Sequence, residues 1–359
     1  MNKIYRTAIV GGRRGLYHAA CYEGIENMKI AALCEKDKNL LDEGAKKLGV
    51  PGYSDYEEML EKEKPDIVHA VTSPVIKRSV WVEAAARHNV KALVIEKPIA
   101  LTPSELAELD AIIKKTNLKV IVNMQRRYMP FNVKFKELID AGQLGDIHFF
   151  RGNCETIWGV VDIATHLIDC MLYMMNDSQP SGVWASVNGA NDFNSPTERG
   201  PDNLIAVYSF KNGARGFVEA VKKPLGTANF PIDLNDFANN KLEPWQPERC
   251  NLDVWTTKGR FWWREYGTWG YQTEGMAMPF TEKTFFAADD ISAQKEFTRA
   301  ISSWLDDGSK PHLNRYELAR VGAELIFGAY RSALDGKYTD LPAEFGDGQL
   351  EQLKNKLIN

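Results

Sequence analysis

The feature that most constrains this chain is a regular alternation of short apolar runs with helical patterns across residues 4–123. The runs carry Val, Ile or Ala at successive positions, which predicts strands that are buried on both faces. Such strands form parallel sheets covered by helices, so we expect a doubly wound parallel sheet of the α/β Rossmann type. The predicted strands are residues 4–10, 30–35, 66–72, 91–96 and 119–123, and the predicted helices are residues 15–26, 38–48, 55–62, 75–88 and 103–116.

After residue 123 the pattern changes to long strand-like runs with fewer helices. Two of these runs are joined by Lys211-Asn212-Gly213, and the Asn-Gly pair predicts a hairpin with a type I′ turn. This order predicts an α+β domain with a large open, mostly antiparallel sheet, so we place two domains at residues 1–123 and 124–359. The predicted strands are residues 146–155, 182–190, 203–210, 214–222 and 251–263, and the predicted helices are residues 130–141, 161–175, 291–307 and 315–335.

The composition excludes several classes of protein. A formal net charge of −4 and the lack of a basic run argue against partners such as nucleic acid or an anionic membrane. No apolar run approaches the roughly 20 residues of a spanning helix and no leader is evident, so we expect a cytoplasmic protein. The five cysteines and six histidines show no CxxC, HxH or HExxH spacing, so we expect reduced thiols and no metal site.

A glycine-rich turn follows the first predicted strand. It consists of Gly11, Gly12, Arg13, Arg14 and Gly15. Glycines at this place let the backbone approach the pyrophosphate of a dinucleotide. Glu35, at the end of the second predicted strand, can accept hydrogen bonds from the ribose hydroxyls of the adenosine. The spacing departs from the usual pattern, because the first glycine position falls on Val10, or on Gly11 with one residue missing.

The choice of cofactor depends on the charges at this turn. An arginine here can also bind a 2′-phosphate, but Glu35 would repel that group, so NAD is favoured over NADP. The alternative is a glycine-rich turn of an ordinary α/β protein, with Glu35 as a surface acid. The register of strand, turn, helix and acid favours the cofactor site.

Two further stretches carry groups that handle protons. Lys97 follows a buried strand, at the sheet edge where doubly wound folds bind ligands, and Pro98 is a candidate for a cis peptide bond. Asp162, His166 and Asp169 are spaced to lie on one stripe of a helix. The alternatives are that Glu96 and Lys97 form a surface pair, and that Asp162 caps its helix while His166 pairs with a neighbouring carboxylate.

In their order and spacing, these motifs resemble the Gfo/Idh/MocA oxidoreductase family, which includes glucose–fructose oxidoreductase and inositol dehydrogenases. Further motifs carry the resemblance along nearly the whole chain: His18 three residues after Gly15, Tyr53-Ser54-Asp55-Tyr56, Pro65-Asp66-Ile67-Val68 leading to Thr72, Glu96-Lys97-Pro98, Arg126-Arg127-Tyr128 with Pro130, and Gly142-Gln143-Leu144-Gly145. The resemblance implies that Lys97, Asp162 and His166 form a catalytic set between a Rossmann domain and a sheet domain. It also implies a cofactor site that includes Thr72, Glu96 and Lys97.

The resemblance implies an NAD-dependent oxidoreductase that transfers hydride between a nicotinamide cofactor and a hydroxyl or keto carbon of a sugar, cyclitol or related polyol. His166 would be the general base, because the reference pKa of histidine, about 6.5, lies close to working pH. Asp162 would orient the hydroxyl and the imidazole. The positive charge of Lys97 would stabilise developing oxyanion character.

The substrate contacts are expected mainly in the second domain. The candidates are Arg127, Tyr128, Asn153, Glu155, Trp158 and Asp169. A tryptophan-rich stretch includes Trp245, Trp255, Trp262, Trp263 and Trp269, and also carries Phe261, Tyr266 and Tyr271. Such aromatic rings suit sugar rings and subunit interfaces equally well. We favour an interface for Trp262 and Trp263, since the resemblance implies a homodimer or homotetramer that associates through the second-domain sheet.

Two other functions remain open. Some family relatives hydrolyse glycosides by transient oxidation and elimination, and such an enzyme needs NAD without reducing it in the net reaction. A nucleotide-binding regulator without catalysis is the other alternative, because a Rossmann fold does not dictate chemistry. The presence of Lys97, Asp162 and His166 weighs against a regulator, whereas no residue decides between dehydrogenase and hydrolase.

Overall fold

The computed structural model of this chain describes residues 3–74, 76–156, 160–194, 200–222, 250–265 and 267–358. Contacts between residues group the chain into two compact units. The first unit comprises residues 1–100, 104–125 and 294–320, and the second comprises residues 101–103, 126–293 and 321–359. The predicted domain boundary at residue 123 stays a prediction.

The first unit contains a six-stranded sheet in the order β3-β2-β1-β4-β5-β6, and its paired strands are all parallel. Strand order therefore reverses between β1 and β4, which makes this the switch point of a doubly wound sheet. The predicted Rossmann sheet is thus confirmed, with one short strand, β3, added. The strands are β1 (Tyr5–Val10), β2 (Met28–Cys34), β3 (Gly52–Tyr53), β4 (Ile67–Ala70), β5 (Ala92–Ile95) and β6 (Lys119–Val122).

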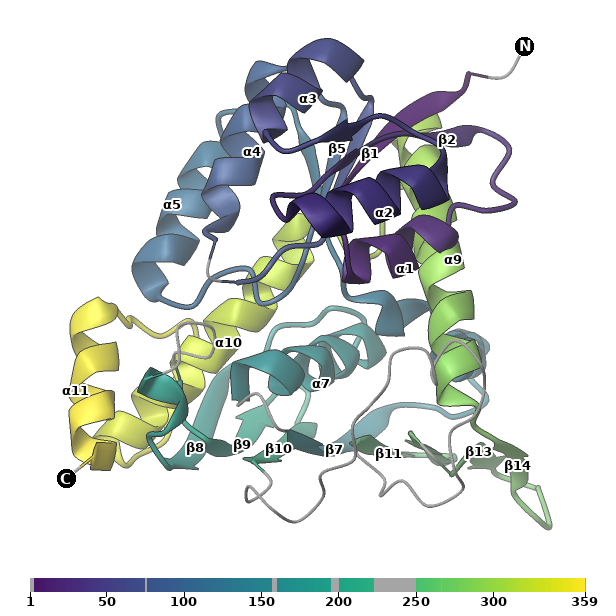
Figure 1. The fold of residues 1–359 in the computed structure, drawn as a ribbon. Coiled ribbons are helices and arrows are strands. Elements are labelled where there is room, and N and C mark those ends of the chain that lie inside the picture. The colour runs from purple at the N-terminus through teal and green to yellow at the C-terminus, as the bar shows by residue number, and fades with distance from the viewer. Residues whose placement is uncertain are drawn as a thin grey trace. The chain divides into compact units, whose positions relative to one another are not determined.

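Helices connect these strands, and right-handed crossovers place α1 and α2 on one face of the sheet and α4 and α5 on the other (Figure 1). The sequence explains where several of them begin and end. Asp37 caps α2 by accepting hydrogen bonds from two backbone N–H groups, and Gly49 ends it with a positive φ of 66°. The helix α5 begins at Pro103, as predicted. The helices are α1 (Arg14–Ala20), α2 (Lys38–Leu48), α3 (Tyr56–Glu63), α4 (Arg78–Arg87) and α5 (Pro103–Ile113).

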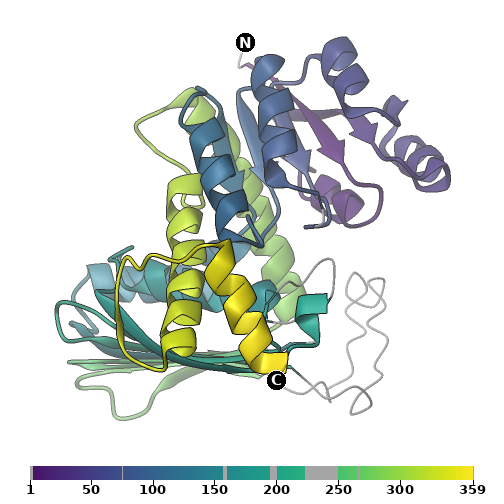
Figure 2. The ribbon, with the colours of Figure 1, turned by 90° about the vertical axis from the view of Figure 1, so that its left-hand side faces the viewer.

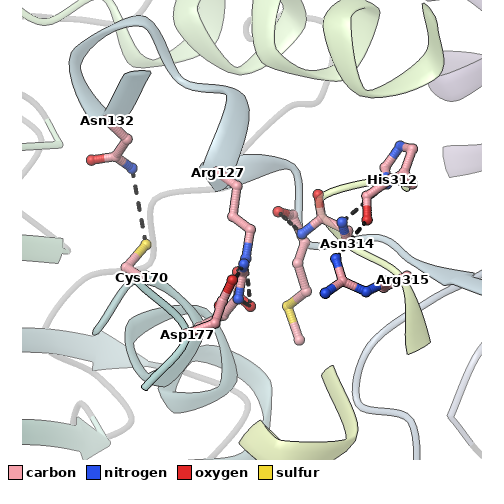
Figure 3. A network of polar contacts seen from close by, with 9 residues as sticks. Arg127, Asn132, Cys170, Asp177, His312, Asn314 and Arg315 are labelled. Carbon is pink, nitrogen blue, oxygen red and sulfur yellow. Dashed lines mark hydrogen bonds and ion pairs between the residues drawn. The ribbon is translucent and has the colours of Figure 1, made fainter. Parts of the chain in front are cut away.

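Residues 294–320 also belong to the first unit, although they come late in the sequence. Arg315 forms an antiparallel bridge with Ile121 of β6. The backbone carbonyl oxygen of Asn314 accepts a hydrogen bond from the backbone N–H of Val122 at 2.9 Å. The backbone N–H of Asn314 donates to Nδ1 of the neighbouring His312 at 3.0 Å (Figure 3). The helices on either side, α9 (Phe286–Asp306) and α10 (Tyr316–Asp335), are each divided between the two units.

The second unit is built on a nine-stranded sheet in the order β14-β13-β12-β11-β7-β10-β9-β8-β15. Only the pair β7 and β10 is parallel among the described pairs, so the predicted open, mostly antiparallel sheet is confirmed. The strands are β7 (Ile147–Thr156), β8 (Gly182–Asn188), β9 (Asn203–Ser209), β10 (Arg215–Lys222), β11 (Cys250–Thr256), β12 (Gly259–Arg264), β13 (Thr268–Thr273), β14 (Phe280–Lys283) and β15 (Thr339–Asp340).

One face of this sheet is covered by helices. Figure 2 shows the sheet nearly edge-on, with α7 (Val160–Met174), α10 and α11 (Asp347–Ile358) on the same side of it. Gly152 and Gly216 lie against Leu167 and Met171 of α7, where a larger side chain would collide. Buried and more exposed residues alternate along β9, β10 and β11, as expected for a sheet with one covered face. We call the opposite side, which no helix covers in the described ranges, the open face.

The hairpin between β9 and β10 confirms one prediction and corrects another. The strands are antiparallel neighbours, as the Asn-Gly pair predicted. Of residues 211–213, however, only Gly213 has a positive φ, at 90°, so the predicted type I′ turn is wrong. The backbone N–H of Gly213 donates to the carbonyl oxygen of Phe210 at 3.0 Å. The loop is thus one residue longer than a type I′ hairpin and needs a left-handed residue at one position only.

Three further expectations concern the cysteines, membrane-spanning helices and metal sites. All five cysteines are buried and free of disulfides, as predicted. Among the described helices, none is both long and apolar enough to cross a membrane. No group of three metal-ligating side chains comes together within the parts of the chain that the structure covers.

Candidate functional site

The glycine-rich turn of the first unit is shaped by steric limits at its ends. Gly11 has a φ of 110°, and a Cβ on it would overlap the carbonyl oxygen of Val71. A Cβ on Gly15 would lie 3.1 Å from Ile9 Cγ2 and 3.3 Å from the carbonyl oxygen of Val10, so Gly15 lets α1 pack closely on β1. Gly11 therefore takes the tight-turn position and Gly15 the helix-packing position of a dinucleotide-binding turn. This removes the ambiguity about Val10.

Glu35 is held against the middle of the same turn. Its Oε2 accepts a hydrogen bond from the backbone N–H of Gly12 at 2.6 Å, and its Oε1 accepts one from the N–H of Asp37 at 3.0 Å. A Cβ on Gly12 would lie 2.9 Å from Glu35 Cγ, so the glycine makes room for the acid. The carboxylate is thus fixed beside the turn, while Arg13 and Arg14 are exposed to solvent. This arrangement suits hydrogen bonds to ribose hydroxyls and disfavours an added phosphate.

Thr72 and Lys97 follow the adjacent strands β4 and β5, whose last residues pair in register. Both side chains are half-buried, and the Lys97–Pro98 peptide bond is cis. The buried guanidinium of Arg78 links these two places. Its Nη1 donates to the carbonyl oxygens of Thr72 and Ser73, both at 3.2 Å, and to Thr72 Oγ1 at 3.0 Å, and its Nε donates to the carbonyl oxygen of Pro98 at 3.4 Å. We did not predict Arg78 from the sequence.

Glu96 lies in a buried polar cluster behind the turn that carries Lys97. Its Oε1 accepts a hydrogen bond from Asn123 Nδ2 at 3.0 Å and lies 3.5 Å from His18 Nε2. The ring centroids of His18 and His69 are 4.9 Å apart, and Tyr22 Oη lies 3.0 Å from His69 Nδ1. Burial lowers the pKa of both histidines well below its usual value, so both are neutral at pH 7. Because Glu96 is buried, a surface ion pair with Lys97 does not describe its environment.

In the second unit, the predicted stripe of polar residues lies on α7. His166 is buried on this helix, which packs on β7 and β10. Asp162 is the third residue of α7, so it does not occupy the cap position, and the structure describes its backbone only. Lys97 belongs to the first unit, whereas Asp162 and His166 belong to the second.

Arg127 and Asp169 bind each other. Arg127 is completely buried in a short 3-10 helix, Gln125–Tyr128, and donates to Asp169 Oδ1 from Nη2 at 2.8 Å and from Nε at 3.0 Å. Its Nη1 lies 2.8 Å from Asp177 Oδ1 (Figure 3). Burial raises the pKa of Asp169, and the Arg127 guanidinium opposes that rise. Substrate contact by Arg127, Tyr128 and Asp169 stays a prediction, and the structure gives Arg127 and Asp169 a pairing that the sequence did not indicate.

The predicted substrate residues of β7 lie on the open face. A Cβ on Gly152 would lie 3.2 Å from Leu167 of α7, so this position faces the helix. Because side chains alternate along a strand, Asn153 and Glu155 lie on the opposite face. The structure therefore places these two residues on the same face of β7. Trp158 lies outside the described residues.

The tryptophan-rich stretch is divided between the two faces of the sheet. Trp263 is completely buried, with its ring centroid 5.2 Å from that of Phe131, so the predicted interface role is wrong for this residue. It faces inward because it alternates with Trp262 along β12. Trp255 and Trp262 line a hollow of about 210 Å³ on the open face, together with Asp253, Arg260, Phe261 and Arg264. Trp245 and Tyr266 lie outside the described residues.

Comparison with known proteins adds to this geometry. Residues 5–124 match the family model GFO_IDH_MocA, described as an oxidoreductase family with an NAD-binding Rossmann fold. Scyllo-inositol 2-dehydrogenase (NAD(+)) of Bacillus subtilis is 30% identical over 239 residues, which is 61% of this chain and 68% of that relative. Myo-inositol 2-dehydrogenase of Thermotoga maritima is 27% identical over 231 residues, which is 60% of this chain and 67% of that relative.

The fold has counterparts among solved structures. An oxidoreductase from Agrobacterium radiobacter, crystallised with NAD+, L-tartaric acid and magnesium, superposes with a TM-score of 0.75. The match covers 94% of this chain and 98% of that chain at 17% sequence identity. At this identity the likeness extends to the fold of the chain.

Proposed function

Because this chain belongs to the Gfo/Idh/MocA oxidoreductase family, we propose that it is an NAD-dependent dehydrogenase of a sugar, a cyclitol or a related polyol. The observation that carries the proposal is the glycine turn. The neighbours of Gly11 and Gly12 leave no room for a side chain at either position, and Glu35 is hydrogen-bonded to the turn itself. The names of the relatives support the substrate class, since two of them are inositol dehydrogenases.

The residues of the first unit fit a dinucleotide. We infer that Gly11, Gly12, Arg13, Arg14 and Gly15 bind the pyrophosphate, and that Thr72, Glu96 and Lys97 complete the cofactor site. Bound NAD would supply the hydride acceptor of the reaction. The fixed carboxylate of Glu35 would accept hydrogen bonds from ribose hydroxyls and repel a 2′-phosphate, which favours NAD over NADP.

The chemistry at the substrate hydroxyl is assigned to Lys97, Asp162 and His166. His166 would take the hydroxyl proton, and its burial on α7 would shield that proton from bulk water. Asp162 would orient the hydroxyl and the imidazole. Lys97, which follows β5 at the ligand-binding edge of the sheet, would stabilise negative charge on the substrate oxygen.

We also infer that copies of this chain associate through the open face as a dimer or tetramer. Large apolar side chains gather there, with Trp184 at 45%, Trp255 at 39% and Ile205 at 38% exposed. Exposed apolar residues on one face of a sheet are typical of subunit interfaces. Trp262, half-buried on the same face, would belong to this interface.

The proposal is tested by following reduced-nicotinamide absorbance with NAD or NADP over a panel of sugars, cyclitols and glycosides, with released aglycone measured in the same samples. We expect net NAD reduction by at least one polyol, and slower reduction of NADP at equal concentration. Aglycone release without net reduction would instead indicate the hydrolase that works by transient oxidation.

Variants identify the catalytic residues in that assay. We expect Lys97→Met and His166→Ala to lower kcat at least 10³-fold while NADH still binds, because each removes a group that acts on the reacting oxygen. The matched controls are Lys91→Met, at the other end of β5, and His148→Ala, both exposed residues. Rates close to those of the wild-type protein in Lys97→Met or His166→Ala would refute the assignment.

A further inference from the structure

We propose that Arg78 is a positioning residue for Lys97, whose turn it ties to the loop after the neighbouring strand. The inference rests on the proposed function, because it assumes that the placement of Lys97 matters for catalysis. Arg78 is the first residue of α4 and is 3% exposed. A long cationic side chain is seldom buried to this extent unless it has defined partners.

The partners of Arg78 belong to two separate loops at one edge of the sheet. Through Nη1 it holds the loop after β4, at Thr72 and Ser73, and through Nε it holds the carbonyl oxygen of Pro98. The strands β4 and β5 pair from Ile67 with Ala92 to Ala70 with Ile95, so both loops leave the sheet at the same level. One side chain thus links the segment that carries Lys97 to the segment that carries a proposed cofactor residue.

The guanidinium group is suited to this task. Its planar arrangement of N–H donors reaches several acceptors in fixed directions, whereas a lysine ammonium is a single point of charge. Burial lowers the pKa of Arg78 to about 10, against the opposing effect of Glu96, so the group stays protonated at neutral pH. In the part of the chain that the structure describes, its hydrogen bonds go to neutral oxygens of the two loops.

A displacement of the turn that carries Lys97 would lower kcat even in protein that is correctly folded. Misplacing a catalytic group by about 1 Å can lower the rate about 100-fold. A purely structural arginine would lower thermal stability but leave the folded enzyme with its normal kcat. A positioning role and a purely structural role can therefore be distinguished by measuring kcat per folded, NADH-binding molecule.

The kinetic test compares Arg78→Met and Arg78→Lys with Arg87→Met, which changes the exposed arginine at the other end of α4. We expect both Arg78 variants to lose 10- to 100-fold in kcat, and Arg87→Met to stay within twofold of wild type. Millimolar guanidinium should restore part of the kcat of Arg78→Met and none of that of Lys97→Met. An unchanged kcat in folded Arg78→Met protein would overturn the proposal.

A second test needs no turnover. Lysine side chains are reductively methylated with a ¹³C label, and the Lys97 resonance is assigned by its disappearance in Lys97→Met. We expect that resonance to move toward the position of exposed lysines in both Arg78 variants and to stay in place in Arg87→Met. An unmoved Lys97 resonance in the Arg78 variants would refute the positioning role. If the resonance moves but the wild-type protein has no dehydrogenase activity, the proposed function alone is refuted.

Discussion

Two buried arginines, one in each unit, use the same functional group in opposite ways. Arg78 donates to neutral oxygens of two loops, and burial lowers its pKa to about 10. Burial would also lower the pKa of Arg127, but the carboxylates of Asp169 and Asp177 raise it above its usual value. The first side chain therefore hydrogen-bonds neutral oxygens, with Glu96 and Glu105 acting on its charge only through space, whereas the second forms direct ion pairs with two carboxylates.

The difference indicates what each arginine contributes. Arg127 joins the 3-10 helix before α6 (Pro130–Asp140) to α7 and to the turn at Asp177, so it links three segments of the second unit. Its removal would leave buried negative charge without compensation. The removal of Arg78 would leave neutral carbonyl and hydroxyl oxygens without their donor, so its effect on stability should be smaller than that of removing Arg127.

The largest effect on stability is expected for Arg127→Met. Breaking one side of a buried ion pair costs about 3–5 kcal/mol, because the remaining charge stays buried without a partner. Urea unfolding at pH 7 measures the change in the free energy of unfolding, with exposed Arg87→Met as the control. A loss below about 1 kcal/mol would show that the ion cluster is not a structural element.

The double variant Arg127→Met/Asp169→Leu completes this measurement. It removes the uncompensated carboxylate of Asp169, so it should be more stable than Arg127→Met by about 1–3 kcal/mol. If the two changes simply add their losses, the pairing of the two side chains is not the source of the effect.

A smaller loss of about 1–3 kcal/mol is expected for Arg78→Met, because it leaves neutral hydrogen-bonding groups without their donor. The same urea titration measures it. Equal losses for Arg78→Met and Arg127→Met would break the distinction between the two arginines.

The smallest effect of a single substitution is expected on a dependence of stability on pH that comes from the first unit. The pKa of His18 and of His69 is lower in the folded protein than in the unfolded chain, so the unfolded chain binds more protons below about pH 6.5. The free energy of unfolding should therefore fall with decreasing pH, by up to about 1.4 kcal/mol per pH unit for each histidine. Unfolding titrations between pH 5 and 7 should give a shallower slope for His18→Gln, and an unchanged slope for the exposed His148→Gln.

The sequence predicts most of the elements that position the site. Continuous apolar runs mark β1, β4 and β5, and Pro103 marks the start of α5, because these signals are local. The strand β14 was missed, since all four of its residues are exposed and show no apolar period. The spacing also predicts the turn glycines and Glu35 as cofactor-site residues; that role stays a prediction, and the structure adds which glycine has which steric role.

The hydrogen-bond and ion-pair partners of buried polar groups could not be predicted from local sequence patterns. Arg78 and Pro98 are 20 residues apart, and Arg127 and Asp169 are 42 apart, so tertiary packing alone brings them together. The strand pattern of β7 shows that Asn153 and Glu155 share a face. Which face α7 covers depends on the connection between strand and helix, which periodicity does not specify.

The order of the segments along the chain limits how the gene for this protein can recombine. The first unit receives residues 294–320 after every strand of the second unit's sheet except β15 has been made, and these residues supply Asp306 to Tyr5 and Asn314 to β6. A gene fragment that ends at residue 125 would leave those partners behind. Recombination could exchange the nucleotide-binding half only by moving two distant pieces of the gene together, so diversification of this half is expected to proceed by substitutions in its loops rather than by exchange as a cassette.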